Sequence, residues 1–223
     1  RQRQMCIRDR FNPIIMANVI KLRKGLDVNL KGKAAKEEFQ VKKPAVYALM
    51  PDDFTGMKPK VVVKENDVVK VGDSLFVDKN HPEIKFVSPV SGRVTMVERG
   101  DRRKVLSVRV EADAEQQYVD FGKKNVGQMT AQEVKDLLLE SGLFGFFRQR
   151  PYDVTANPSD TPKAIFVSAF NSMPLAADFE YVLRGREADF QAGLDALAKM
   201  AKTYLGVSSK QTATASVSYT HLR

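Results

Sequence analysis

One stretch, residues 68–94, limits the possible folds of this chain more than any other. It reads VVKVGDSLFVDKNHPEIKFVSPVSGRV and begins as an alternating apolar strand that runs into a turn at Gly72 and Asp73. A second turn signal, SPVSG at residues 88–92, lies between two short strands. Together the two turns predict a small sandwich of hairpins folded back on itself.

Short apolar runs recur through residues 44–112, and the breaks between them are rich in Gly, Pro, Asp and Asn. Short strands at this spacing are typical of a small barrel or sandwich. We expect strands at residues 45–50, 60–63, 68–71, 74–77, 85–87, 92–97 and 105–110.

This pattern resembles the barrel-sandwich hybrid of lipoyl and biotinyl carrier domains, in which a V-x-x-G-D-x-L hairpin leads to an S-P-x-x-G-x-V turn. In those carriers the modified lysine lies at a tight hairpin tip. The corresponding candidate is Lys79, which follows Asp78 but precedes Asn80, His81 and Pro82. Because this hairpin is longer and less regular than a carrier tip, we expect Lys79 to be unmodified. His81, which precedes a proline, is expected in a surface loop.

Both ends of the chain match the translation of a single DNA element. Residues 1–10 and 216–223 correspond to a sequencing-library adapter read on opposite strands, and residues 11–15 to untranslated sequence before Met16. We therefore set these ends aside from the fold. Without them the formal net charge falls from +9 to +5, because they carry five arginines and one aspartate. The single cysteine also lies there, so we expect no disulfide and no thiolate chemistry. One histidine, His81, then remains, and it cannot form a metal cluster alone.

Residues 16–43 form a basic segment with eight Lys and Arg against three Asp and Glu. Such a segment is either a solvated edge or an anchor for an acidic partner or an anionic membrane face. Nucleic acid is not an expected partner, because aromatic residues that could stack on bases are almost absent here. No apolar run approaches the roughly 20 residues that span a bilayer. No signal-peptide core follows Met16, so we expect a cytoplasmic location.

Residues 113–215 change from strand periodicity to a mixed pattern. Thr130 and Glu133 form a capping box before a helix that is expected to end at Gly142. Further on we expect a buried parallel strand with an exposed apolar edge, two amphipathic helices and a second strand, at residues 163–170, 175–185, 190–200 and 204–207. This order begins an α/β domain and then stops. The expected fold class is therefore mixed α+β, a barrel-sandwich hybrid followed by a truncated α/β domain.

The loop after the first helix is a possible ligand site. Residues 141–145 read SGLFG, but a loop that cradles phosphate needs several glycines, and here Phe146 and Phe147 follow instead. Arg148 and Arg150 could hold a carboxylate or a neighbouring subunit, or could simply be solvated.

Other chemical signals are weak. The sequence contains no paired carboxylates, nucleophile–base arrangement, CxxC or GxGxxG, so we expect no catalytic residue and no metal ligand, and assign no cofactor-binding residue. A basic hairpin tip, expected to be solvated, carries Arg99, Arg102, Arg103 and Lys104.

Ordered motifs between residues 20 and 206 resemble the A subunits of the Na+-translocating NADH:quinone reductases. The first is IKLRKGLD at residues 20–27, and the longest later one is NSMPLAA at residues 171–177. The others lie at residues 75–79 with Pro82, 86–92, 98–100, 102–103, 141–143, 148, 150–151, 163–167, 190 and 193–194.

This resemblance implies a peripheral subunit on the cytoplasmic face of the bacterial inner membrane, in a complex that passes electrons from NADH to ubiquinone and exports Na+. The family is related to the flavin subunit of complex I and to the C subunit of the Rnf complex, in which the SGL stretch continues into a glycine-rich flavin loop. Residues 144–150 replace those glycines, so no flavin is expected here. The subunit would be structural or quinone-associated, with NADH, flavins, iron–sulfur centres and Na+ handled by other subunits.

Two alternatives remain open. The first is a C-type subunit of the Rnf complex. The second is a lipoyl or biotin carrier domain fused to an α/β enzyme.

Overall fold

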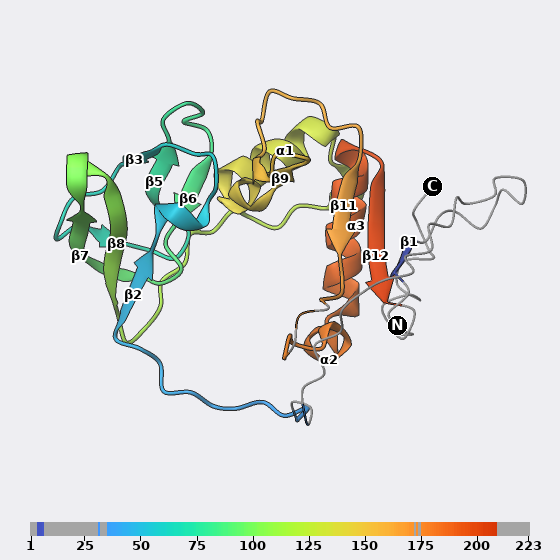
Figure 1. Cartoon of the computed structure of the whole chain (residues 1–223), viewed down its shortest axis with the longest axis horizontal. Helices are drawn as coiled ribbons and strands as arrows, with labels where there is room; N and C mark the ends of the chain where they lie inside the picture. The colour runs from blue at the N-terminus through green and yellow to red at the C-terminus, as the bar shows by residue number, and fades with distance from the viewer. Residues whose placement is uncertain (1–3, 7–30, 32–34, 172, 174, 209–223) are drawn as a thin grey trace, which may run out of the picture. The chain divides into compact units, whose positions relative to one another are not determined.

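The computed structural model describes residues 4–6, 31, 35–171, 173 and 175–208 (Figure 1). Two compact units divide the chain. The sandwich unit comprises Val41–Asn125 and Gln132–Thr161, and the α/β unit comprises Arg1–Gln40, Val126–Ala131 and Pro162–Arg223 as far as they are described. Most of the basic segment at residues 16–43 lies outside the described residues, as does the expected adapter end at residues 216–223.

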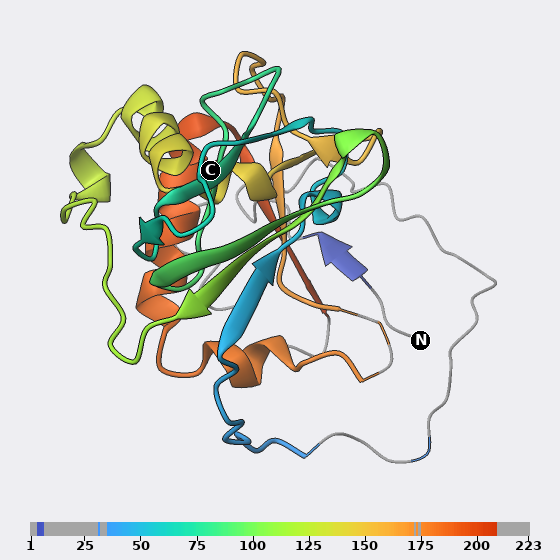
Figure 2. The same ribbon diagram turned by 90° about the vertical axis from the view of Figure 1, so that its left-hand side faces the viewer.

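The sandwich unit contains two antiparallel sheets (Figure 2). The four-stranded sheet has the order β2 (Val46–Leu49), β8 (Val105–Ala112), β7 (Gly92–Arg99) and β4 (Val68–Val69). The three-stranded sheet has the order β3 (Pro59–Val61), β5 (Ser74–Asp78) and β6 (Lys85–Val87). All seven strands expected from the sequence are confirmed, as is the hybrid architecture.

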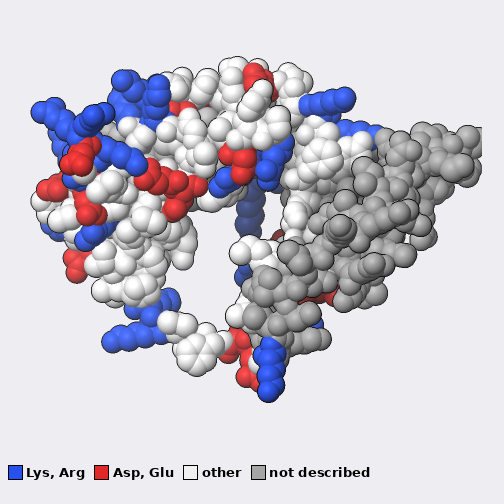
Figure 3. All heavy atoms as spheres, viewed as in Figure 1, with Lys and Arg blue, Asp and Glu red and all other residues white. Residues whose placement is uncertain are grey.

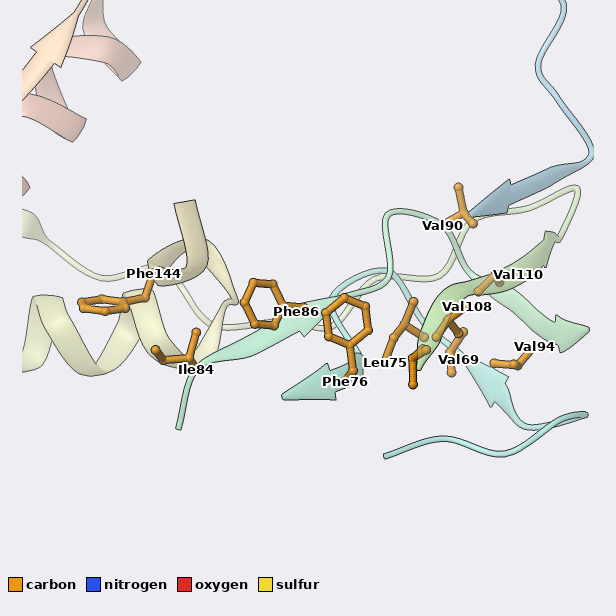
Figure 4. Close-up of a cluster of buried hydrophobic side chains, with 11 residues drawn as sticks. Val69, Leu75, Phe76, Ile84, Phe86, Val90, Val94, Val108, Val110 and Phe144 are labelled. Carbon is orange, nitrogen blue, oxygen red and sulfur yellow. The ribbon is translucent and has the colours of Figure 1, made fainter. Parts of the chain in front are cut away.

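The core of this unit follows from the alternation of apolar residues along the strands. Val94 of β7 lies opposite Val110 of β8, and both side chains are at most 1% exposed. Leu75 and Phe76 of β5 are fully buried. Figure 4 shows these side chains in one continuous cluster that extends from the four-stranded sheet to Phe144, outside both sheets. Burial of this cluster is the main favourable term in the folding of the unit.

The two turn signals lie next to each other and are joined by hydrogen bonds. Gly72 N–H donates to the carbonyl of Ser88 at 3.1 Å, and Ser88 N–H donates to the carbonyl of Asp73 at 2.8 Å. Gly92 closes the second turn at a φ of +157°, where a Cβ would lie 1.8 Å from the carbonyl oxygen of Glu111. Only glycine fits there, which explains the residue in the SPVSG motif.

Whereas Val126–Ala131 belong to the α/β unit, most residues that follow the strands, up to Thr161, also belong to the sandwich unit. They form α1 (Ala131–Glu140), the 3-10 helix η4 (Leu143–Phe146) and the short hairpin of β9 (Arg148–Gln149) and β10 (Val154–Thr155). The helix begins directly after Thr130, as predicted, and Gly142 adopts the expected left-handed conformation with a φ of +76°.

The α/β unit has a three-stranded sheet with the order β1 (Gln4–Cys6), β12 (Thr203–Ser208) and β11 (Ile165–Ser168). β11 and β12 are parallel, as predicted, and β11 lies at an edge. The helices are α2 (Phe179–Leu183) and α3 (Glu187–Met200), with the 3-10 helix η3 (Val126–Gln128) beside α3. β1 comes from the N-terminal end that the sequence set aside, and the adapter origin of that end stays a prediction.

Two expectations for this unit are wrong in part. The run at residues 163–170 is buried on one face only, because Ala169 is fully buried in the cluster with Leu194 of α3 whereas Phe166 is 74% exposed. The first amphipathic helix is shorter than predicted and begins at Phe179. Leu175, expected inside it, has a left-handed φ of +60° that an α-helix cannot contain.

Candidate functional site

The loop between α1 and β10 covers one end of the sandwich and contains the second candidate site of the sequence. Gly142 ends α1, where its N–H donates to the carbonyl of Leu139 at 3.3 Å. A Cβ at this position would lie 2.6 Å from Cγ1 of Val87. Gly142 is therefore needed both for its left-handed backbone and for its close approach to β6.

The next turn of this loop forms an aromatic plug, defined here as residues 142–147. Gly145 lies against Phe86 so closely that a Cβ would be 2.7 Å from Cε1 of that ring. Phe144 is 5% exposed and stacks on Phe147 with ring centroids 5.4 Å apart. Phe147 N–H donates to the carbonyl of Phe144 at 3.0 Å, which closes the turn. The glycines of this loop thus serve packing against β6.

Further rings extend the plug into the core. Phe86 stacks on Phe76 at 5.0 Å between centroids, and Phe54 lies 4.3 Å from Phe86. Phe146 contacts the edge of Phe54 at 5.7 Å while remaining 69% exposed. Such contacts between aromatic rings prefer defined geometries and stabilise the packing beyond the burial of apolar area.

Arg148 and Arg150 turn toward one carboxylate of their own chain. Nη1 of Arg148 lies 3.6 Å from Oδ2 of Asp153, and Nη1 of Arg150 lies 3.6 Å from Oδ1 of the same residue. Asp153 adopts a left-handed φ of +56°, and the bond between Arg150 and Pro151 is cis. The sequence suggested a carboxylate partner, but no local signal identified Asp153 as that partner.

Lys79 is exposed and lies at the start of the loop between β5 and β6. Its N–H donates to the carbonyl of Lys58 at 2.7 Å. The preceding Asp78 is 4% exposed, and its Oδ1 accepts hydrogen bonds at 3.1 Å from the backbone N–H groups of Lys58 and Asn80. Lys79 is therefore the first residue after β5 and lies at the start of the loop. His81 lies in the same loop, with Nδ1 3.8 Å from Oε1 of Glu83.

The basic hairpin joins β7 and β8 through a 3-10 turn at Asp101–Arg103. Lys104 binds Asp52 with 2.7 Å between Nζ and Oδ2. Below the tip, the carboxylate of Glu98 accepts hydrogen bonds from Ser107 at 2.8 Å and Arg109 at 2.7 Å. These two donors and the charge of Arg109 hold the pKa of Glu98 below its usual value.

Two properties bear on the site as a whole. Among the described residues there is no group of three or more His, Cys, Asp and Glu side chains that could hold a metal ion. Over the same residues, no helix has both the length and the apolar character needed to cross a bilayer.

Comparison with known proteins places both parts of the chain in one family. Residues 20–113 match the NqrA N-terminal barrel-sandwich hybrid domain, and residues 129–222 match the NqrA second alpha/beta domain. The chain belongs to the NqrA family. The resemblance inferred from the motifs is confirmed, and neither the Rnf-type nor the carrier alternative gains support.

Relatives of this chain are the A subunits of Na(+)-translocating NADH-quinone reductases. The one from Pseudomonas aeruginosa (strain UCBPP-PA14) is 35% identical over 190 residues, which are 84% of this chain and 42% of the relative. Those from Yersinia pseudotuberculosis (serotype O:1b, strain IP 31758) and Serratia proteamaculans (strain 568) are 36% and 37% identical over 186 residues, 82% of this chain and 41% of each relative. The chain thus spans about two fifths of the length of these NqrA relatives.

Proposed function

We propose that this NqrA chain is a docking module in a Na+-translocating NADH:quinone reductase, peripheral on the cytoplasmic face of the membrane. It would contribute to electron transfer from NADH to ubiquinone, coupled to Na+ export, by holding subunits together or by lying near the quinone. NADH, flavins, iron–sulfur centres and Na+ would be handled by other subunits. The module itself would not be catalytic.

The observation that carries this proposal is the aromatic plug. A flavin phosphate needs a loop whose backbone N–H groups face an open space. In this chain Gly142 and Gly145 approach Val87 and Phe86 instead, so that a Cβ on either would collide with those side chains. The loop packs against β6 and so connects α1 to the sandwich, which supports a structural role.

The outer surface of the same loop supports docking on another protein. Leu143, Phe146 and Tyr152 are 53%, 69% and 76% exposed, and Arg150 lies among them in the sequence. Exposed aromatic residues beside arginine are the side chains that contribute most to protein–protein interfaces. We therefore assign this surface to contact with a neighbouring subunit of the reductase.

A co-purification experiment tests the docking surface. Membranes of a Pseudomonas aeruginosa strain that lacks its own NqrA would be incubated with the tagged chain, and the reductase subunits recovered with it would be quantified. Replacement of Phe146 and Tyr152 by serine should reduce recovery by more than tenfold. Replacement of Tyr118, which is 69% exposed in the same unit, should have little effect. Equal recovery with all three proteins would refute this assignment.

The absence of carrier chemistry has its own test. The backbone N–H of Lys79 donates to the carbonyl of Lys58, and the residue directly follows the buried Asp78. Lys79 therefore lies at the start of the β5–β6 loop, which supports the proposal that it is not a carrier lysine. After co-expression with a lipoyl or biotin ligase, the intact mass should equal that of the unmodified chain. A mass increase that maps to Lys79 would instead establish a carrier domain.

A further inference from the structure

We propose that the tip of the β7–β8 hairpin binds the anionic phospholipid surface of the membrane. The basic tip is defined as Arg99, the last residue of β7, with Arg102 and Arg103 of the 3-10 turn. Figure 3 shows Lys and Arg side chains at the surface of the part of the molecule that contains this hairpin. All three side chains are exposed. None forms a salt bridge with any residue that the structure describes, whereas the neighbouring Lys104 is neutralised by Asp52. The tip therefore carries three guanidinium groups without an ion-pair partner in the described part of the chain, with one exposed carboxylate, that of Asp101, in the same turn.

The conformation of the tip is unusual for these residues. Arg102 and Arg103 follow each other with left-handed φ values of +53° and +60°. The left-handed backbone conformation is unfavourable for most residues with a Cβ, and the residues usually found in it are glycine, asparagine and aspartate. Two successive arginines there are consistent with a functional role for their side chains, because strained backbone is concentrated at functional sites.

Backbone hydrogen bonds close the turn at the tip. Gly100 N–H donates to the carbonyl of Lys104 at 2.8 Å, and Lys104 N–H donates to the carbonyl of Asp101 at 3.1 Å. A Cβ on Gly100 would lie 3.1 Å from Cδ1 of Leu106, so that side chain covers the inner side of the turn. The guanidinium groups are thus presented on an ordered support.

Phospholipid headgroups fit this arrangement better than an enclosed anion. The end of a hairpin is convex and cannot surround a single phosphate, but it can meet a layer of them. Guanidinium groups bind phosphate oxygens through paired N–H donors, and basic residues near an anionic bilayer are attracted to it. This inference rests on the proposed function, since a peripheral subunit of a membrane complex works within reach of such a surface.

The test is co-flotation of the full chain with vesicles of phosphatidylglycerol and phosphatidylcholine in equal parts. The test variant is R99Q/R102N/R103N, because asparagine tolerates the left-handed backbone and the fold should be retained. The matched control is K79Q/K123Q/K124Q, which removes the same charge from exposed lysines elsewhere in the sandwich unit. Circular dichroism spectra of both variants should match that of the unaltered chain.

We expect the unaltered chain and the control to float with the vesicles at low salt, and the tip variant to bind on the order of a hundredfold more weakly, at about fivefold per arginine. Binding should vanish on pure phosphatidylcholine and weaken with added salt. Free phosphate at the concentration of the vesicle phosphate should not compete.

Equal weakening in both variants would overturn the proposal in favour of diffuse attraction by net charge. A tip variant that floats normally would also overturn it. If that variant then failed to co-purify with the reductase, the tip would be assigned to an acidic protein surface. The proposed function fails on different grounds, namely when the unaltered chain recovers no reductase subunits.

Discussion

The contact between Gly145 and Phe86 gives the sharpest prediction about the aromatic plug. In Gly145→Ala the new methyl would lie 2.7 Å from Cε1, 3.2 Å from Cδ1 and 3.3 Å from Cζ of the Phe86 ring. The ring cannot easily move away, because it is 2% exposed, stacks on Phe76 and contacts Phe54 in a tilted arrangement. Overpacking of this kind typically costs about 1–3 kcal/mol of unfolding free energy.

A double-mutant cycle separates this collision from other effects. Phe86→Leu alone leaves a void and should also destabilise, by about 1–3 kcal/mol on the scale of other large-to-small core changes. In the double variant the alanine methyl occupies part of that void. The combined loss should then be smaller than the sum of the single losses, with a coupling of at least about 0.5 kcal/mol.

The assay is urea unfolding of the full chain, followed by near-ultraviolet circular dichroism, which reports the packing of aromatic rings. The urea midpoint of the sandwich transition should fall in each single variant, with no change in its slope. Gly145→Ala with unchanged stability, or additive losses in the double variant, would refute the idea that the plug packs on β6 as described.

Three further predictions concern single side chains. Gly193→Ala should stabilise the α/β unit by about 0.5–1 kcal/mol in thermal unfolding, because at this exposed position inside α3 the new methyl would meet no described atom within 4 Å apart from its chain neighbours and the helix's own backbone. A loss of stability would contradict the open environment. Asp178→Ala should cost about 0.5–2 kcal/mol in the same assay, since the carboxylate caps α2 by accepting a hydrogen bond from Glu180 N–H at 3.0 Å; an unchanged midpoint would argue against the cap. Because the pKa of Glu98 is lowered in the folded state, its ionised form stabilises the fold above the usual titration range of carboxylates, and this contribution is lost as the pH falls through the folded pKa. The unaltered chain should therefore lose its advantage in unfolding free energy over Glu98→Gln as the pH falls. If this advantage grew in acid instead, the pKa of Glu98 would not be lowered by folding.

Local signals predicted the sandwich because its strands and turns are encoded in short patterns. The alternation of apolar residues marked all seven strands, and the GD and SPVSG turns contain the glycines whose backbone the fold requires. The capping box similarly placed the start of α1 at Ala131. In each case the residues that decide the structure are neighbours in the sequence.

What the sequence did not reveal depends on contacts between distant residues. No sequence pattern near Gly145 predicted its contact with Phe86. The sequence around Lys104 likewise gave no sign that Asp52 would be its ion-pair partner. The predicted burial of residues 163–170 is too high, because burial depends on which elements cover each face of a sheet. On one face α3 supplies Leu194, while on the other Phe166 stays exposed and stacks on Tyr204.

We propose that the chain docks on a Na+-translocating NADH:quinone reductase as part of its NqrA subunit. The most direct measurement is equilibrium binding of the labelled chain to Pseudomonas aeruginosa membranes that contain the reductase but lack its own NqrA. We predict saturable binding that the Pseudomonas aeruginosa NqrA displaces, and no such binding to membranes from a strain without the reductase. Equal binding to both membranes, without displacement, would contradict the account.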